Sequence, residues 1–192
     1  MRIRTALPLI ACMAPALALA QTETKPTGPT RPPRPRDERV SVAQLRVAGR
    51  VYVGERAPDF ELTSSRERTV VLSRLRGYLV LLHFTGDHRQ FAALKGIDTT
   101  MTRLGYVMLG VSKDSPQALR AFAQREDIPF ELLADPTGEI SALYGLFDSV
   151  HGETEPGFVI LDRTGTVRLA LLGQSIPADQ IVDLARFTLT NL

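Results

Sequence analysis

Three side chains that could do chemistry follow one another in the short loop Thr85-Gly86-Asp87-His88-Arg89. At the start of a helix, they could form an anion or ligand site, or His88 could act as a general base. The simpler interpretation is structural, with Asp87 as the helix N-cap and with His88 and Arg89 solvated. We favour the structural interpretation and keep Asp87, His88 and Arg89 as candidate binding residues.

The other histidines give a weaker signal. His83 lies inside an apolar run, where a hydrogen-bonded core histidine is more usual than a ligand, and His151 lies in the polar segment SVHGETEPG. The three histidines could bind a metal only if they converged with Asp87, and no close ligand spacing supports this. The polar residues 112–115 are explained by a capped helix start. No phosphate loop, nucleophile elbow or zinc signature is present, so we predict no cofactor and no metal.

The loop follows the six residues Leu79–Phe84, which are almost all apolar and do not alternate. Such a run is typical of a central parallel strand buried on both faces, and α/β sheets form their sites where these strands end. Other strands are expected near residues 60–62, 69–72, 106–111, 130–133, 157–161 and 166–172, and helices over 91–104, 116–123, 140–144 and from 177. This order predicts an α/β fold, a mixed central sheet flanked by helices with an N-terminal β-hairpin.

Composition and the first 50 residues predict the domain organisation. The 192 residues allow one domain with tails. Residues 1–20 have basic residues at Arg2 and Arg4, an apolar stretch and a small-residue cleavage site, as in a secretory signal peptide. Residues 21–50 are a Pro/Arg-rich disordered linker, and residues 51–192 are the folded domain. We therefore expect export to the bacterial periplasm or the extracellular space, and nothing after residue 20 resembles a transmembrane helix.

The only cysteine, Cys12, leaves an alternative open. The sequence Leu-Ile-Ala-Cys that ends at Cys12 resembles a lipobox, which would make the protein a lipid-anchored lipoprotein. We favour cleavage after Ala20, because the apolar stretch before Cys12 is shorter than the roughly 7–15 residues of a signal peptide. Membrane contact is expected only if Cys12 is lipidated. The basic linker lacks interleaved aromatic residues, so no nucleic-acid partner is predicted.

Five segments in register resemble a known family. VGERAPDFEL at 53–62 is similar to the opening of peroxiredoxins of the alkyl hydroperoxide reductase/thiol-specific antioxidant type, also called redoxins. LRG at 75–77, LGVS at 109–112, DPTGE at 135–139 and FVILD at 158–162 follow in the family's order. The resemblance covers nearly all of the folded region and implies a three-layer thioredoxin-like fold.

The resemblance also implies a mechanism that these residues do not match. In the family, a cysteine thiolate at the start of the helix after the central strand attacks the peroxide, with an arginine to activate it. Here residues 86–89 replace the proline–threonine–cysteine loop, and Thr154-Glu155-Pro156-Gly157 occupies the place of the arginine. The resemblance also places a cis-proline opposite the active loop, and it leaves cis and trans equally open for Glu155–Pro156.

We therefore expect a pseudoenzyme, a redoxin domain that has lost thiol chemistry and binds an unknown protein or small molecule. Its cleft would lie near Asp87, His88, Glu155 and Pro156. The alternative is an antioxidant oxidoreductase that works by a non-thiol route or with a partner thiol, so whether the chain is an enzyme stays open.

Overall fold

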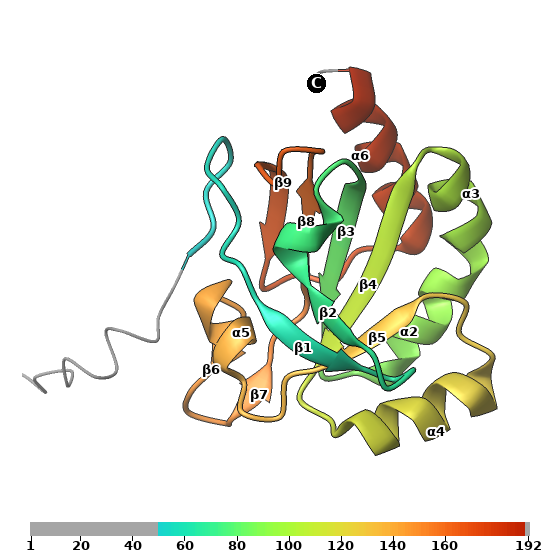
Figure 1. Cartoon of the computed structure of the whole chain (residues 1–192), viewed down its shortest axis with the longest axis vertical. Coiled ribbons are helices and arrows are strands. Elements are labelled where there is room, and N and C mark those ends of the chain that lie inside the picture. The colour runs from blue at the N-terminus through green and yellow to red at the C-terminus, as the bar shows by residue number, and fades with distance from the viewer. Residues whose placement is uncertain (1–49, 191–192) are drawn as a thin grey trace, which may run out of the picture. The chain divides into compact units, whose positions relative to one another are not determined.

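The computed structural model describes residues 50–190 (Figure 1). The expected signal peptide, Cys12 and nearly all of the expected linker lie outside these residues. The described elements are, in order, β1 (Glu61–Ser64), β2 (Thr69–Val71), η1 (Leu72–Leu75), β3 (Leu79–Phe84), α2 (His88–Leu94), η2 (Lys95–Ile97), α3 (Asp98–Arg103), β4 (Tyr106–Ser112), α4 (Pro116–Glu126), β5 (Glu131–Ala134), α5 (Glu139–Leu143), β6 (Phe147–Asp148), β7 (Glu153–Thr154), β8 (Gly157–Leu161), β9 (Val167–Leu172) and α6 (Ala178–Thr190).

A seven-stranded mixed sheet organises the domain, with strand order β2-β1-β5-β4-β3-β8-β9. β3, β4 and β5 are parallel, whereas β8 and β9 on one side and β1 and β2 on the other run antiparallel to their neighbours. All six residues of β3 are buried, as the apolar run predicts. The N-terminal hairpin β1–β2 extends this sheet through the pairing of β1 with β5.

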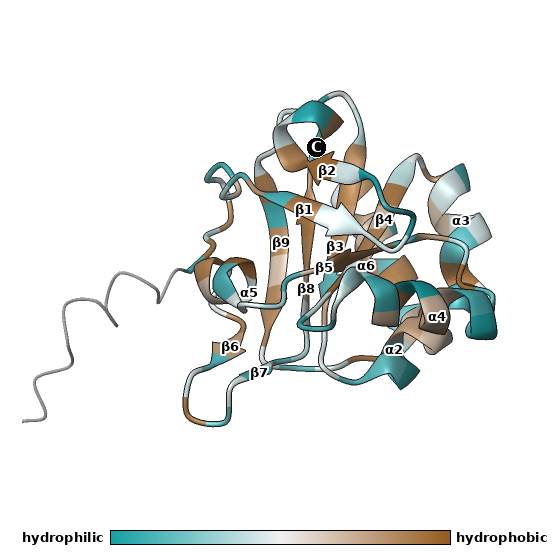
Figure 2. Ribbon diagram, turned by 60° about the horizontal axis from the view of Figure 1, so that its bottom comes forward, coloured by the Kyte–Doolittle hydropathy of each residue, from teal (hydrophilic) through white to brown (hydrophobic). Residues whose placement is uncertain are grey.

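Alternate side chains of β3 supply two separate cores. Leu79 and Leu81 pack in one core with apolar residues of α2, α3, α4 and α6. Val80, Leu82 and Phe84 pack in the other core with Tyr144, after α5, and with apolar residues of the N-terminal segment. Figure 2 shows largely apolar strands at the centre of the domain and hydrophilic outer faces on the helices. The predicted three-layer α/β fold is confirmed.

Two features differ from the expectation. The single helix predicted over residues 91–104 is divided into α2, the short 3₁₀ segment η2 and α3. Gly96 lies in the 3₁₀ segment, and glycine is among the poorest residues in a helix interior. The two-residue strands β6 and β7 pair with each other and were not predicted, because two residues are too few to show alternation.

Within residues 50–190, no helix has the length and apolar character required to cross a bilayer.

Candidate functional site

A cleft of about 590 Å³ opens beside the carboxyl ends of β3 and β4. One wall is made by the loop after β3 and the start of α2, a second by the end of β4, and a third by the segment around β7. Its lining residues are Thr85, Gly86, Asp87, Gln90, Ser112, Lys113, Asp114, His151, Gly152, Glu153, Thr154 and Pro156. This is the edge of an open α/β sheet at which ligands usually bind.

Local hydrogen bonds fix the start of α2. The Asp87 carboxylate accepts a hydrogen bond from the Arg89 backbone N–H at 3.0 Å, and the Asp87 N–H donates to Thr85 Oγ1 at 2.9 Å. The Gly86 N–H donates to the Thr154 carbonyl at 3.1 Å and so joins this loop to β7. The Arg89 guanidinium folds back on Asp87 at 2.9 Å, and these hydrogen bonds lower the pKa of the Asp87 carboxyl. Asp87 is the helix cap, as predicted, and Arg89 is exposed.

The prediction that His88 is simply solvated was wrong. Its Nε2 lies 2.7 Å from Asp114 Oδ2, and its ring packs against Phe91 and Phe122 at centroid distances of 6.3 and 4.6 Å. The same Asp114 oxygen accepts a hydrogen bond from the Ser112 hydroxyl. Burial alone would raise the pKa of Asp114, but the hydrogen bonds from Ser112 and His88 outweigh it and lower this pKa.

The order of these three groups decides what they can do. A serine nucleophile is activated when histidine lies between serine and the carboxylate. Here Asp114 lies in the middle and binds both Ser112 and His88. The arrangement therefore holds the histidine and the serine in place, and it does not form a proton-transfer triad.

The opposite wall of the cleft is built from the segment between α5 and β8. The Lys113 ammonium donates to the Gly152 carbonyl at 2.5 Å and lies 5.7 Å from the centre of the Phe147 ring. His151 forms a hydrogen bond with the Asp148 carboxylate, which raises the pKa of His151. Lys113 thus joins this wall to the end of β4.

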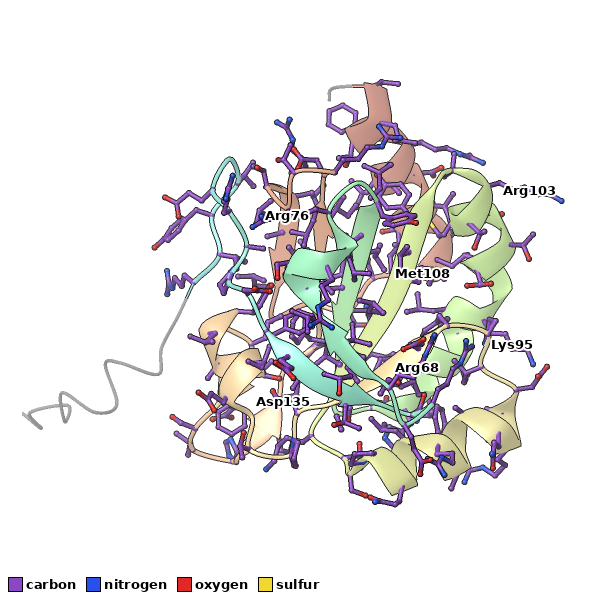
Figure 3. All side chains as sticks on the ribbon, in the orientation of Figure 1. Arg68, Arg76, Lys95, Arg103, Met108 and Asp135 are labelled. Atoms are coloured by element: carbon purple, nitrogen blue, oxygen red, sulfur yellow. The ribbon has the colours of Figure 1, made fainter. Side chains whose placement is uncertain are left out.

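Asp135 supports the same wall from within. It directly follows β5 (Figure 3), is 1% exposed, and accepts hydrogen bonds at 2.8 Å from both the N–H and the hydroxyl of Ser141. The Ser141 hydroxyl in turn lies 3.4 Å from the Thr154 hydroxyl. This chain of contacts connects the start of α5 to a residue that lines the cleft.

Only two of the five predicted site residues line the cleft, namely Asp87 and Pro156. His88, Arg89 and Glu155 do not line it, although each is close in the sequence to a residue that does. The Glu155 backbone N–H donates to the Leu146 carbonyl at 2.9 Å, which fixes the chain just before Pro156. Residues 50–190 contain no group of three or more metal-ligating side chains, so the three histidines and Asp87 do not converge there.

His83 is the histidine of the core. It is buried within β3, as predicted, but neither ring nitrogen has a hydrogen-bond partner among the described residues. The Gln90 side chain interacts with the ring and partly offsets the effect of burial on the pKa of His83. Burial lowers the pKa of His83 to about 4, so its imidazole is neutral at pH 7.

Sequence reasoning missed much of the cleft lining. The capped start of α4 is confirmed, since Ser115 Oγ accepts from the Ala118 N–H at 3.2 Å, but Ser112, Lys113 and Asp114 also face the cleft. A usable signal was their position at the end of the strand beside β3, because parallel strands bring their carboxyl ends together. The contribution of residues 151–154 had no comparable signal.

Comparisons with known proteins identify the family to which this fold and sequence are similar. The sequence model of the AhpC/TSA family matches residues 53–170. The chain is 28% identical over 153 residues to the chloroplastic peroxiredoxin Q of Gentiana triflora, covering 76% of this chain and 70% of that protein.

Solved structures show the same fold. The peroxidoxin BcpB of Mycobacterium tuberculosis superposes with a TM-score of 0.66 at 20% identity, covering 74% of this chain and 98% of that one. The AhpC of Enterococcus faecalis gives a TM-score of 0.68 at 17% identity, over 73% and 93% of the two chains. On the match to more than half of its length, together with this fold, the chain belongs to the AhpC/TSA family of peroxiredoxin-like proteins.

Proposed function

We propose that this protein is an exported redoxin domain that uses its cleft to bind a ligand or a protein and does not reduce peroxides with a thiol of its own. One observation carries the proposal: residues 50–190 contain no cysteine, and the cleft is lined by oxygen and nitrogen groups instead. Thiol peroxidases need a thiolate that accepts an oxygen atom as sulfenic acid. No side chain that lines this cleft can form one.

The side chains at the start of α2 support a binding role. Asp87 is occupied by its own helix cap and by Arg89, and His88 is held by Asp114. These contacts make the loop a fixed polar surface. The carboxylates of Asp87 and Asp114 and the Lys113 ammonium all line the cleft. The ligand of the cleft is therefore expected to be polar, and either uncharged or carrying both a positive and a negative group.

Export is supported by the pattern of residues 1–20 and is part of the proposal. Intact mass of the protein recovered from the producing cell distinguishes the two processing routes. Cleavage after Ala20 leaves a chain that begins at Gln21, whereas lipoprotein processing leaves a lipid-modified Cys12.

Family membership favours a second candidate, an antioxidant oxidoreductase that borrows a thiol from a partner or uses a non-thiol route. The test is peroxide consumption by residues 21–192, purified free of metal, first with a small dithiol and then with a dithiol protein such as a thioredoxin. Rates equal to the protein-free controls in both assays support the binding proposal. Turnover only with the dithiol protein identifies the second candidate, and turnover with the small dithiol contradicts the binding proposal.

A further inference from the structure

Three loops meet at the end of the sheet that lies opposite the cleft. They are residues 50–59, residues 74–78 and residues 162–168 around the turn between β8 and β9. The Gly54 N–H donates to the Val167 carbonyl at 2.8 Å. The Gly77 N–H donates to the Arg163 carbonyl, also at 2.8 Å. The turn therefore holds one loop on each side of it. Figure 1 shows these loops in the upper part of the domain, whereas β6, β7 and α4 lie in the lower part.

Most of the exposed large apolar side chains lie in these loops. Five such side chains are exposed among residues 50–190, and three of them are Tyr52 (56%), Val53 (64%) and Tyr78 (57%). Apolar side chains that are exposed together mark interaction sites more often than single ones do. A tyrosine ring has an apolar body and a polar tip, which suits the boundary between water and a bilayer.

The three loops are also basic, on a domain that is otherwise acidic. They contain six arginines and three acidic residues, whereas residues 50–190 as a whole contain 15 basic and 18 acidic residues. Arg56 and Arg163 are exposed, and neither forms an ion pair with a carboxylate among residues 50–190. Arg76 lies at the same end of the domain and is exposed as well (Figure 3). This end therefore offers positive charge to a partner.

The sequence that precedes the domain adds positive charge at the same place. Residues 21–50 contain seven basic and three acidic residues, and they join the domain at Arg50, two residues before Tyr52. A folded partner presents a limited surface. An anionic bilayer is continuous, so it can meet both the loops and the basic segment, whatever path that segment takes. The distribution of charge therefore favours a membrane surface over a protein.

We propose that the three loops dock this domain on the surface of a bilayer that contains anionic lipids. Arg56, Arg76 and Arg163 would lie at the level of the lipid phosphates, and Tyr52 and Tyr78 at the polar interface. The sequence alone linked membrane contact to a lipidated Cys12, whereas this surface acts without a lipid anchor. The inference is independent of the function proposed for the cleft.

The direction of β3 determines where the cleft lies in the docked protein. β3 begins at Leu79, next to Tyr78, and ends at Phe84, next to Thr85 of the cleft. Six strand residues span about 20 Å, so the cleft would remain in the solvent when the loops touch the bilayer.

The experiment is cosedimentation of residues 21–192 with lipid vesicles. Leaving out residues 1–20 removes an apolar stretch that would bind any bilayer. Vesicles with about a third phosphatidylglycerol are expected to bind the protein at least about tenfold more tightly than vesicles of phosphatidylcholine alone. This binding is expected to be lost at about 0.5 M salt, where the Debye length is roughly 4 Å. Equal binding to both kinds of vesicle, or no binding to either, would overturn the proposal.

Variants identify the surface that binds. R56Q and R163Q are each expected to weaken binding to the anionic vesicles about fivefold, the factor that corresponds to about 1 kcal/mol for each basic residue. Y78S is expected to weaken it as well. The controls are R125Q on α4 and V150S between β6 and β7, which change equally exposed side chains away from the loops. If R163Q and Y78S bind as tightly as these controls, the loops do not dock and the proposal is wrong.

A fluorescent label tests the orientation. Residues 21–192 contain no cysteine, so Y78C and V150C each provide a single position for a solvent-sensitive fluorophore. Anionic vesicles are expected to shift the emission of the label to shorter wavelength in Y78C and to leave it unchanged in V150C. A shift in V150C alone would overturn the proposal. A dimer that forms without vesicles and is dissociated by Y78S would also overturn it, because the loops would then bind a second copy of the chain.

Discussion

The buried imidazole of His83 makes the stability of the domain depend on pH in a range where apolar core residues do not titrate. In the unfolded chain this histidine has a pKa near 6.5, and burial lowers the pKa to about 4 in the folded protein. Between these two values the unfolded state binds a proton that the folded state does not. The free energy of unfolding therefore rises with pH through this window, and the contribution is fully present above pH 6.5.

The size of the effect follows from the pKa difference. Each pKa unit corresponds to about 1.4 kcal/mol, so lowering the pH from 7 to 4 is expected to remove about 3 kcal/mol through His83 alone. Little of this is screened by solvent, because the side chain is 3% exposed. A loss of that size is a large fraction of the total stability of a typical domain.

The assay is urea unfolding of the unmodified protein and of the H83F variant at pH 7, 5.5 and 4.5. Carboxylates such as Asp114 also titrate on the acid side, but they are present in both proteins and cancel in the difference. The unmodified protein is expected to lose about 2 kcal/mol more than H83F between pH 7 and 4.5. The exposed His151 provides a matched control, since hydrogen bonding to Asp148 raises its pKa and H151Q should keep the acid loss. A difference between the unmodified protein and H83F that does not change with pH would show that His83 does not make the stability of the domain pH-dependent.

Two substitutions test the packing of the core and of the cleft wall. G110A is expected to destabilise the domain by about 1–3 kcal/mol in thermal unfolding, because the added Cβ would lie 2.6 Å from the Phe91 ring. G96A is the control, since no atom lies within 4 Å of its Cβ, and it should show no such loss. D135A is expected to cost about 2–3 kcal/mol in urea unfolding, because it leaves the buried N–H and hydroxyl of Ser141 without their acceptor. A loss below about 0.5 kcal/mol, the range of ordinary surface changes, would show that Asp135 does not hold the wall of the cleft.

The sequence predicts those strands and helices whose apolar residues form a long, regular pattern. The continuous apolar run 79–84 is β3, and helical spacing from Pro116 agrees with α4. The break at Gly96 was not predicted, because the apolar spacing from Phe91 to Leu104 continues across it. The spacing of apolar residues shows which face of a helix is buried. It does not show where the backbone changes from α-helical to 3₁₀ hydrogen bonding, as it does at residues 95–97.

Contacts in the candidate site could be predicted only where both partners lie in the same short segment of the sequence. Asp87 as a helix cap involves its own neighbours, and the local pattern was sufficient. The contact between His88 and Asp114 joins positions 26 residues apart, so it depends on how β3 and β4 align. Alternation along β3 places His83 on the face of Leu79 and Leu81, but the side chains that surround its ring, such as Phe91 and Gln90, become visible only in three dimensions.

We propose that the folded domain of this peroxiredoxin-like protein carries no peroxide-reducing group. The most direct measurement is the second-order rate constant for consumption of hydrogen peroxide and of an organic hydroperoxide, by rapid mixing, for metal-free full-length protein and its C12A variant. Both proteins are expected to match the protein-free control with either oxidant, because residues 50–190 contain no thiol. A rate above that control that persists in C12A would show that the domain reduces peroxide without a thiol of its own.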